Sequence, residues 1–281
     1  MYKNILSFYR INDWVKSIGF CILGLTATKF LQIINPFLFF IGILQSCFLF
    51  SFLFSLNDFF DYIIHKEKNF IGKIIDKSIL SKNFVLLLCF LPLLPSITIL
   101  YLNSSESYLI TLLLFIILSI SYSLPKIRLR DIPIIDVICN VLFFSLIFLQ
   151  SYFFVNDIII PKVYFLLFWI VLYSFSHEIL HQISHFEMDK RSGRTSTTIL
   201  LGKKESIVLF KYSLLLPVLG ILFYFLFHGF EVFVGVMILF ALMRFFYVLK
   251  LNEKSDFKKL RNKLGGILEG GLYLILNILE F

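Results

Sequence analysis

The chain has 281 residues, of which 59% are hydrophobic, and a formal net charge of +8. A soluble globular domain is about 45–50% apolar, so this composition excludes a soluble core as the place where all the apolar side chains are buried. The apolar runs are about 17–24 residues long without strict alternation, which predicts helices that span a bilayer and excludes the short alternating strands of a membrane barrel. We therefore expect an all-α integral membrane protein.

Nine apolar runs follow one another along the chain and predict about nine transmembrane helices in a single polytopic domain, residues 1–281. Two long loops, at about 57–82 and 186–204, follow the second and the sixth run. The expected spans are residues 15–34, 36–56, 83–101, 107–123, 132–154, 162–185, 205–227, 231–249 and 265–281.

Lysine and arginine residues fall almost entirely in alternate loops. Lys29 and Lys162 stand at the side opposite the N-terminus, Lys211 and Arg244 lie within spans, and the rest of the 26 basic residues share the side of the N-terminus. The positive-inside rule places that side in the cytoplasm. We therefore predict a protein of the plasma membrane, or of the inner membrane in a prokaryote, with its N-terminus and both long loops in the cytoplasm. Because the charge follows the loops, it does not indicate nucleic-acid binding.

The first polar cluster stands at the end of the second expected span and contains Asn57, Asp58, Asp61 and His65. The last three are spaced i, i+3 and i+7, so a helix would put them on one face. Two carboxylates at the end of an apolar helix are costly unless an opposite charge compensates them. A divalent cation such as Mg²⁺, which takes oxygen ligands and bridges carboxylates to phosphates, would supply that charge. The alternative is a helix end solvated at the membrane surface.

The second polar cluster closes the sixth expected span. His177, His181, His185 and Asp189 recur every four residues, so a helix would place them in one stripe. Three histidines within an apolar span indicate a functional site, and the alternative is a set of polar side chains that join neighbouring helices. The two clusters are expected on the same side of the membrane.

Together the clusters resemble the motifs of the UbiA superfamily of intramembrane prenyltransferases. Asn57, Asp58 and Asp61 match the family's first motif, N-D-x-x-D-x-x-x-D. The stretch from Tyr122 to Arg130 looks like the family's Y-S-x-P segment with trailing basic residues, and residues 10–16 are similar to a common N-terminal signature. The resemblance covers nearly the whole chain.

The second motif is matched more loosely. The family has D-x-x-x-D, then G-x-x-T, and a glycine six residues after the Thr. Here Asp189, Gly193, Ser196 and Gly202 fall at those spacings, with Ser196 in place of the Thr.

The resemblance implies a UbiA-like bundle of nine helices around a central polar cavity that faces the cytoplasm. A polyprenyl diphosphate would enter from the membrane lipid, and its prenyl group would pass to an acceptor. Mg²⁺ is the implied cofactor, held against the diphosphate by acidic residues, while basic side chains neutralise the leaving group. The sequence does not fix the acceptor, whether an aromatic or quinone precursor or a lipid, or the prenyl length.

The resemblance assigns three sets of residues. The catalytic residues are Asp58, Asp61 and Asp189. The diphosphate-binding residues are Asn57, Tyr122, Lys126, Arg128, Arg130 and Lys16. The metal ligands are Asn57, Asp58, Asp61, His65, His181, His185 and Asp189.

Two histidines depart from the family pattern. His65 stands where the last aspartate of the first motif is expected, and His185 where the first aspartate of the second motif is expected. Imidazole is a poorer ligand for Mg²⁺ than for Zn²⁺, Mn²⁺ or Fe²⁺, so Mn²⁺ or another divalent metal is the alternative cofactor. Three interpretations stay open: an active enzyme with fewer Mg²⁺ ligands or a different metal, a histidine that acts as acid or base, and a member that has lost catalysis.

Two other functions compete with this hypothesis. The segment from His177 to His181 reads H-E-x-x-H, with Glu178 as its acid, which is the pattern of a zinc metalloprotease. A polytopic transporter with a polar intramembrane site is the second competitor. The protease interpretation leaves the Asn57–Asp61 motif, the block from Asp189 to Gly202 and the nine spans unexplained. A transporter would predict internal repeat symmetry, of which the chain has only a faint echo between the second and the sixth span.

Overall fold

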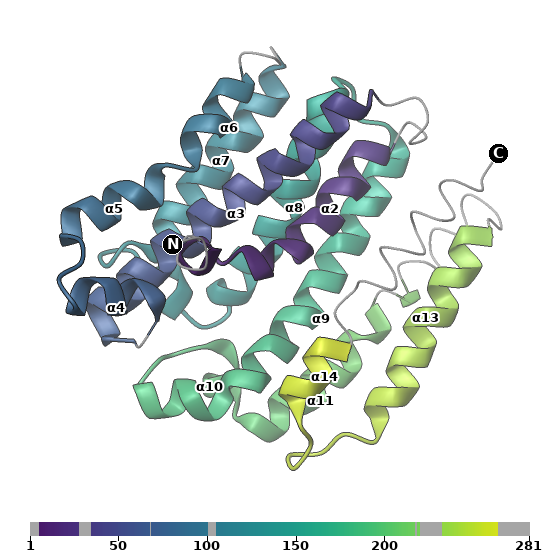
Figure 1. The fold of residues 1–281 in the computed structure, drawn as a ribbon. Coiled ribbons are helices and arrows are strands. Elements are labelled where there is room, and N and C mark those ends of the chain that lie inside the picture. The colour runs from purple at the N-terminus through teal and green to yellow at the C-terminus, as the bar shows by residue number, and fades with distance from the viewer. Residues whose placement is uncertain are drawn as a thin grey trace. The chain divides into compact units, whose positions relative to one another are not determined.

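The computed structural model describes residues 6–27, 35–67, 69–100, 105–216, 218–219 and 232–263, which are helical without a strand among them (Figure 1). The ninth expected span, residues 265–281, lies outside this part. The chain divides into two compact units. Unit 1 comprises Met1–Leu129 and Leu146–Ile158, and unit 2 comprises Arg130–Ser145 and Ile159–Phe281.

Unit 1 is built around one long helix, α3 (Pro36–His65), which contacts five other helices of the unit. Asn35 begins α3 by accepting a hydrogen bond from the Phe37 N–H, and Pro36 occupies the first turn, where no N–H is needed. The other elements of unit 1 are η1 (Ile11–Asp13), α2 (Trp14–Thr26), α4 (Phe70–Asp76), α5 (Lys82–Phe90), α6 (Leu93–Leu100), α7 (Glu106–Ser123) and the second part of α8 (Ile135–Val155).

Small residues let the helices of unit 1 approach closely. A Cβ at Gly24 of α2 would lie 2.3 Å from the Phe148 carbonyl oxygen of α8, and a Cβ at Gly42 of α3 would lie 2.9 Å from the Leu25 side chain. The hydroxyls of Ser51 and Ser55 donate to backbone carbonyls of α3 itself, so they are satisfied inside the apolar packing. Close backbone contact through small residues is the usual way in which helices associate in lipid.

Unit 2 is built around α9 (Pro161–Ser192), which contacts three shorter helices of the unit. Ile179, Leu180 and Ile183 of α9 pack with residues of α8, α11, α13 and α14 in one buried apolar cluster. The other elements of unit 2 are η2 (Leu129–Asp131) from its second residue on, the first part of α8, α10 (Thr197–Leu201), α11 (Lys203–Ser213), α13 (Val232–Leu249) and α14 (Phe257–Lys263).

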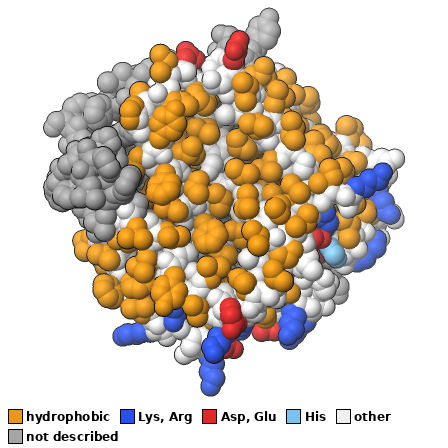
Figure 2. All heavy atoms as spheres, turned by 180° about the vertical axis from the view of Figure 1, so that it is seen from behind, with side chains coloured by type: hydrophobic (Ala, Val, Ile, Leu, Met, Phe, Trp, Pro, Cys, Tyr) orange, Lys and Arg blue, Asp and Glu red, His pale blue; other side chains and the backbone are white. Residues whose placement is uncertain are grey.

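Five helical segments of the described chain are long and apolar enough to cross a bilayer, namely Pro36–His65, Lys82–Ile99, Glu106–Ser123, Ile135–Val155 and Val163–Ser192. Large apolar side chains such as Leu113 and Ile117 of α7 are exposed, and hydrophobic side chains dominate the surface seen in Figure 2. Such a surface needs lipid around it. The chain is therefore an integral membrane protein, but the expected total of nine spans is not confirmed for the described residues.

Candidate active site

The first polar cluster lies on a helix, as its spacing predicted. Helix α3 does not stop with the apolar run at residue 56 but continues to His65, where Lys66 takes a left-handed conformation and ends it. Asn57 and Asp61 are buried, and Asp58 is half-buried. The helix thus carries two carboxylates of the motif to its last two turns.

A buried arginine holds Asp61. The Arg128 Nη2 lies 2.9 Å from Asp61 Oδ1, and the side chains are 8% and 3% exposed. The Asn57 amide donates to the other carboxylate oxygen of Asp61 at 3.2 Å. A charged pair so far from water depends on this geometry, because removing either partner would leave a buried charge without compensation.

The turn after α7 aims Arg128 at Asp61. The Leu124 carbonyl accepts from the N–H groups of Ile127 and Arg128, and Arg128 adopts a left-handed backbone with φ 36°. Lys126 on the same turn is exposed, and Tyr122 is half-buried. The described contacts therefore bring Arg128, which was predicted to bind diphosphate, to the first motif.

A second arginine lies beside Asp58. The Arg10 Nη1 is 3.4 Å from Asp58 Oδ1, while the same guanidinium contacts Asp13 at 2.8 Å and lies 4.7 Å from the centre of the Phe54 ring. The Arg10–Asp58 pair is longer than the Arg128–Asp61 pair, and it is more accessible to solvent because the Arg10 side chain is 38% exposed. The sequence indicated this N-terminal segment only as a signature and did not predict the contact.

Tyr9 fastens the segment that carries Arg10. Its hydroxyl donates to the Leu88 carbonyl of α5 at 3.1 Å. Burial raises the pKa of Tyr9 to about 12, so the hydroxyl keeps its proton and remains a donor at neutral pH. Lys16, the last predicted diphosphate ligand, is part of α2, and its side chain lies outside the described residues.

Helix α4 packs on the end of α3. The Asn69 amide nitrogen donates to the Asp58 carbonyl at 2.7 Å, and its amide oxygen caps α4 by accepting from the Gly72 N–H at 2.7 Å. The Tyr62 hydroxyl donates to Asp76, and a Cβ at Gly72 would lie 2.4 Å from the Tyr62 ring. The predicted loop at about 57–82 therefore contains the end of α3 and a short helix bonded to it.

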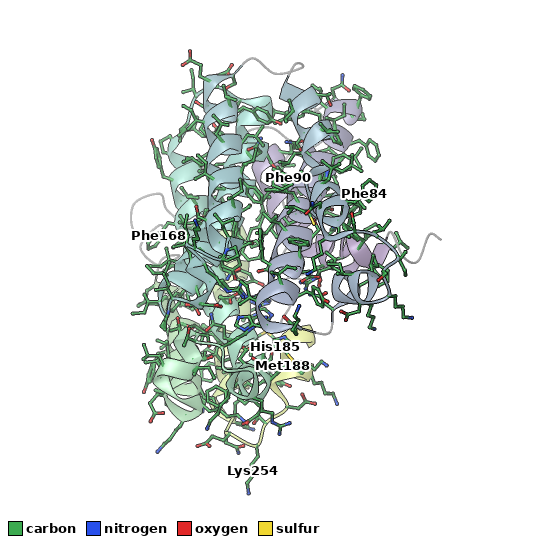
Figure 3. All side chains as sticks on the ribbon, turned by 90° about the vertical axis from the view of Figure 1, so that its left-hand side faces the viewer. Phe84, Phe90, Phe168, His185, Met188 and Lys254 are labelled. Carbon is green, nitrogen blue, oxygen red and sulfur yellow. The ribbon has the colours of Figure 1, made fainter. Side chains whose placement is uncertain are left out.

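The second polar cluster also lies on a helix, because α9 continues past residue 185 to Ser192. His181 and His185 are half-buried, with ring centres 4.9 Å apart, and the labelled His185 and Met188 lie on the same stretch of α9 (Figure 3). Asp189 is paired with Arg194 at 3.6 Å. His177 stacks on Tyr173 instead.

A buried polar network that the sequence did not predict stands beside this stripe. The Gln182 amide donates to Asp136 Oδ2 at 2.9 Å and to Glu178 Oε1 at 3.2 Å, and its oxygen accepts from the Thr198 N–H at 3.2 Å. Asp136 in turn accepts from the Thr197 N–H at 2.9 Å and from the Thr197 hydroxyl. Gln182 thus joins α8, α9 and α10.

Two glycines with positive φ determine the backbone path of the segment after α9. Gly193 ends α9 with φ 71°, and Gly202 has φ 86°, which is a conformation that other residues rarely adopt. Ser196 caps α10 by accepting from the Ile199 N–H at 3.3 Å. A threonine could cap α10 in the same way, so the Ser196 departure from the family pattern preserves the local structure.

The donor chemistry of the first cluster suits a hard divalent cation, since Asn57, Asp58 and Asp61 offer amide and carboxylate oxygens on one helix end. Within the described residues no group of three or more His, Cys, Asp or Glu side chains is gathered closely enough to hold a metal ion. The first cluster belongs to unit 1, whereas the stripe of α9, with Arg130 on the chain before α8, belongs to unit 2.

Glu178 shows how the H-E-x-x-H pattern is used in this fold. Its carboxylate is buried, accepts from Gln182, and lies 3.5 Å from His181 Nδ1. A metalloprotease needs this glutamate free to activate a water molecule. The described contacts give Glu178 a role in the buried network and provide no support for the protease interpretation.

The sequence model of the UbiA prenyltransferase family matches residues 17–268. No curated protein matches the chain by sequence. Among solved structures, a UbiA homolog from Archaeoglobus fulgidus bound to GPP and Mg²⁺ is similar, with a TM-score of 0.78 and 18% identity over 98% of each chain.

Two further structures share the fold. The same homolog bound to DMAPP and Mg²⁺ has a TM-score of 0.77 and 17% identity, covering 98% of this chain and 99% of that chain. Digeranylgeranylglyceryl phosphate synthase has a TM-score of 0.68 and 17% identity, covering 99% of this chain and 98% of that chain. At sequence identities this low, the structural similarity shows a common fold and does not show a common substrate.

Proposed function

The chain belongs to the UbiA prenyltransferase family, and from that premise we propose that it transfers the prenyl group of a polyprenyl diphosphate to an acceptor at the membrane. The observation that carries the proposal is the end of α3, where Asp58 and Asp61 stand beside a buried arginine. Carboxylates that can hold a metal next to a guanidinium that can hold a phosphate are the groups that a diphosphate headgroup requires.

The proposal assigns Mg²⁺ as the metal, because a homolog of the same fold is described as bound to GPP or DMAPP together with Mg²⁺. Asn57, Asp58 and Asp61 would hold it from α3, and the motif residues His181, His185 and Asp189 of α9 are the further ligands that we propose from the sequence. His65 would add a ligand at the end of α3. Bound Mg²⁺ supplies positive charge at the diphosphate oxygens as the carbon–oxygen bond breaks.

The residues of the chain have separate tasks in this scheme. Arg128 would bind the diphosphate and neutralise its charge as it leaves, and Lys126, Arg130 and Lys16 would add to the positive field. Tyr122 would donate a hydrogen bond to a phosphate oxygen. Apolar side chains around the prenyl tail would exclude water, which protects the allylic cation until the acceptor attacks it.

The orientation of the protein is part of the proposal. The distribution of lysine and arginine along the chain places the N-terminus and the ends of α3 and α9 in the cytoplasm. Single-cysteine labelling in intact cells would check this orientation: a cysteine at exposed Lys77 should react only after the membrane is opened, and labelling of intact cells would reverse the assignment.

Diphosphate release is the direct test of the function. Purified protein in nanodiscs would be incubated with geranyl or geranylgeranyl diphosphate, Mg²⁺ and a panel of aromatic, quinone-precursor and glycerol-phosphate acceptors. Release that requires an acceptor and is lost with Asp61→Ala supports the transferase. Zinc-dependent peptide cleavage that is lost with Glu178→Gln would support the protease, and ion flux into proteoliposomes without diphosphate release would support a transporter.

A further inference from the structure

Each aspartate of the first motif has its own arginine in this structure. Arg128 approaches Asp61 from the turn after α7, and Arg10 approaches Asp58 from the segment before α2. Both arginines have left-handed backbone conformations, with φ 36° and 50°. Two separate segments of unit 1 thus place a guanidinium on the carboxylates that the proposed function assigns to a metal.

The Arg128 contact occupies Asp61 on both sides. Arg128 Nη2 lies 2.9 Å from one carboxylate oxygen, and the Asn57 amide donates to the other at 3.2 Å. A cation that approached Asp61 in this arrangement would meet the positive charge of Arg128 and the N–H groups of Asn57. The positive charge of Arg128 therefore disfavours metal binding at Asp61 for as long as the arginine holds the carboxylate.

Burial explains why the arginine is there. Asp61 is 3% and Arg128 is 8% exposed, so an ionised Asp61 without a partner would be strongly disfavoured. The guanidinium stays charged at all relevant pH values and binds a planar carboxylate or a phosphate equally well in geometry. A diphosphate headgroup can therefore replace Asp61 as the partner of Arg128.

We propose that Arg128 occupies Asp61 in the resting protein and exchanges it for the diphosphate when the prenyl substrate binds, which frees Asp61 for the divalent metal. The inference rests on the proposed function and deepens it by stating the order of events: metal alone binds weakly, and metal with diphosphate binds strongly. Arg10 makes the same exchange at Asp58 with a smaller effect on metal affinity, because Arg10 Nη1 lies 3.4 Å from Asp58 Oδ1 and the Arg10 side chain is 38% exposed.

The test measures metal binding rather than turnover. Mn²⁺ binding to the full chain in nanodiscs would be followed by electron paramagnetic resonance of the free ion, without any diphosphate. Arg128→Gln should bind Mn²⁺ about tenfold more tightly than the wild type, because the binding-competent fraction of Asp61 rises. Arg10→Gln should show a smaller gain, and Lys77→Gln, which removes an exposed charge of α4's end, should show none.

Thermal unfolding supplies a second measurement on the same samples. Without metal, Arg128→Gln should unfold at a lower temperature than the wild type, and Mn²⁺ alone should restore most of the loss. If Arg128→Gln does not fold, the Mn²⁺ affinity of Arg10→Gln tests the inference instead, because the Arg10 side chain is partly exposed and its replacement should disturb folding little. Unchanged or weaker Mn²⁺ binding by the folded arginine variants overturns the inference.

A geranyl thiodiphosphate analogue, which resists cleavage of the bond to the prenyl carbon, separates this inference from the proposed function. The wild type should gain Mn²⁺ affinity when the analogue is added, and Arg128→Gln should gain much less. Tight binding of the analogue with Mn²⁺ to the wild type, together with no gain for the arginine variants on metal alone, removes the exchange and leaves the transferase. Failure of the analogue to bind the wild type removes the transferase.

Discussion

The ends of α3 and α9 carry the two halves of one family motif set, but they are stabilised differently. At the end of α3 the motif carboxylates are intact and each contacts an arginine, with Asp61 and Arg128 both buried. At the end of α9 two histidines line a half-buried stripe, Asp189 is paired with Arg194, and the carboxylates of Asp136 and Glu178 lie in a buried network around Gln182. The first region thus pairs its motif carboxylates with arginines, whereas in the second region histidines stand in the stripe beside a buried hydrogen-bond network.

The largest effect should come from the carboxylate at the centre of the first region. Asp61→Ala should lower diphosphate release by about a thousandfold or more, since it removes a proposed metal ligand and leaves Arg128 without its partner. Release would be measured with saturating Mg²⁺ and prenyl diphosphate. Asp157→Ala, which removes an exposed acid of the same unit, is the matched control, and near-normal release by folded Asp61→Ala would refute the assignment of the site.

In the second region, a change in the buried hydrogen-bond network should lower the stability of the protein. Gln182→Leu should destabilise the protein by about 2–3 kcal/mol, because Asp136 and the Thr198 N–H lose a buried hydrogen-bond partner. Unfolding in detergent would be followed by circular dichroism. Ser184→Ala, two residues further along the same helix, loses the bond that its hydroxyl donates to the His181 carbonyl and should change stability less. Equal stability of the two variants would show that the network is not a support.

The histidine stripe gives a smaller and opposite effect. His185→Asp restores the carboxylate of the family pattern, so Mg²⁺-dependent turnover should stay equal to or rise severalfold above the wild type. Turnover with Mg²⁺ and with Mn²⁺ would be compared, and the gain should be larger with Mg²⁺. Loss of turnover with both metals would give His185 a role of its own as acid or base.

The smallest effect is expected at the cap of α10. Ser196→Thr should change stability by less than about 0.5 kcal/mol, because either hydroxyl can accept from the Ile199 N–H, whereas Ser196→Ala should cost about 1 kcal/mol. Chemical unfolding of the pair would measure the difference. A large loss with Thr would mean that the extra methyl group, and not the cap, decides this position.

Several helical features could be predicted because they depend on residues that are close together in the sequence. The i, i+3 spacing of Asp58 and Asp61 predicted one helical end, and α3 carries both. The glycines after Asp189 were matched to the family's second motif, and both Gly193 and Gly202 have a positive φ. The UbiA resemblance drawn from these motifs is confirmed by the family match.

Contacts between distant residues were not predictable from one sequence. Arg128 lies 67 positions from Asp61, and Asp136 lies 46 from Gln182, so no local period marks either pair. The charged residue Asp136 inside an expected span was the available signal for the network, since an acid in an apolar helix needs partners. The roles of the site residues and the count of nine spans stay predictions.

Asn69 combines two bonds in one side chain: it starts α4 and it holds the Asp58 carbonyl, while Tyr62 and Asp76 fasten the far end of the same helix. Helix α4 therefore cannot lift from α3 without breaking a bond to a residue that carries one of the site's carboxylates. The position of α4 and the position of Asp58 are consequently coupled, so changes at Asn69, which touches no reacting atom, should alter the activity of the site.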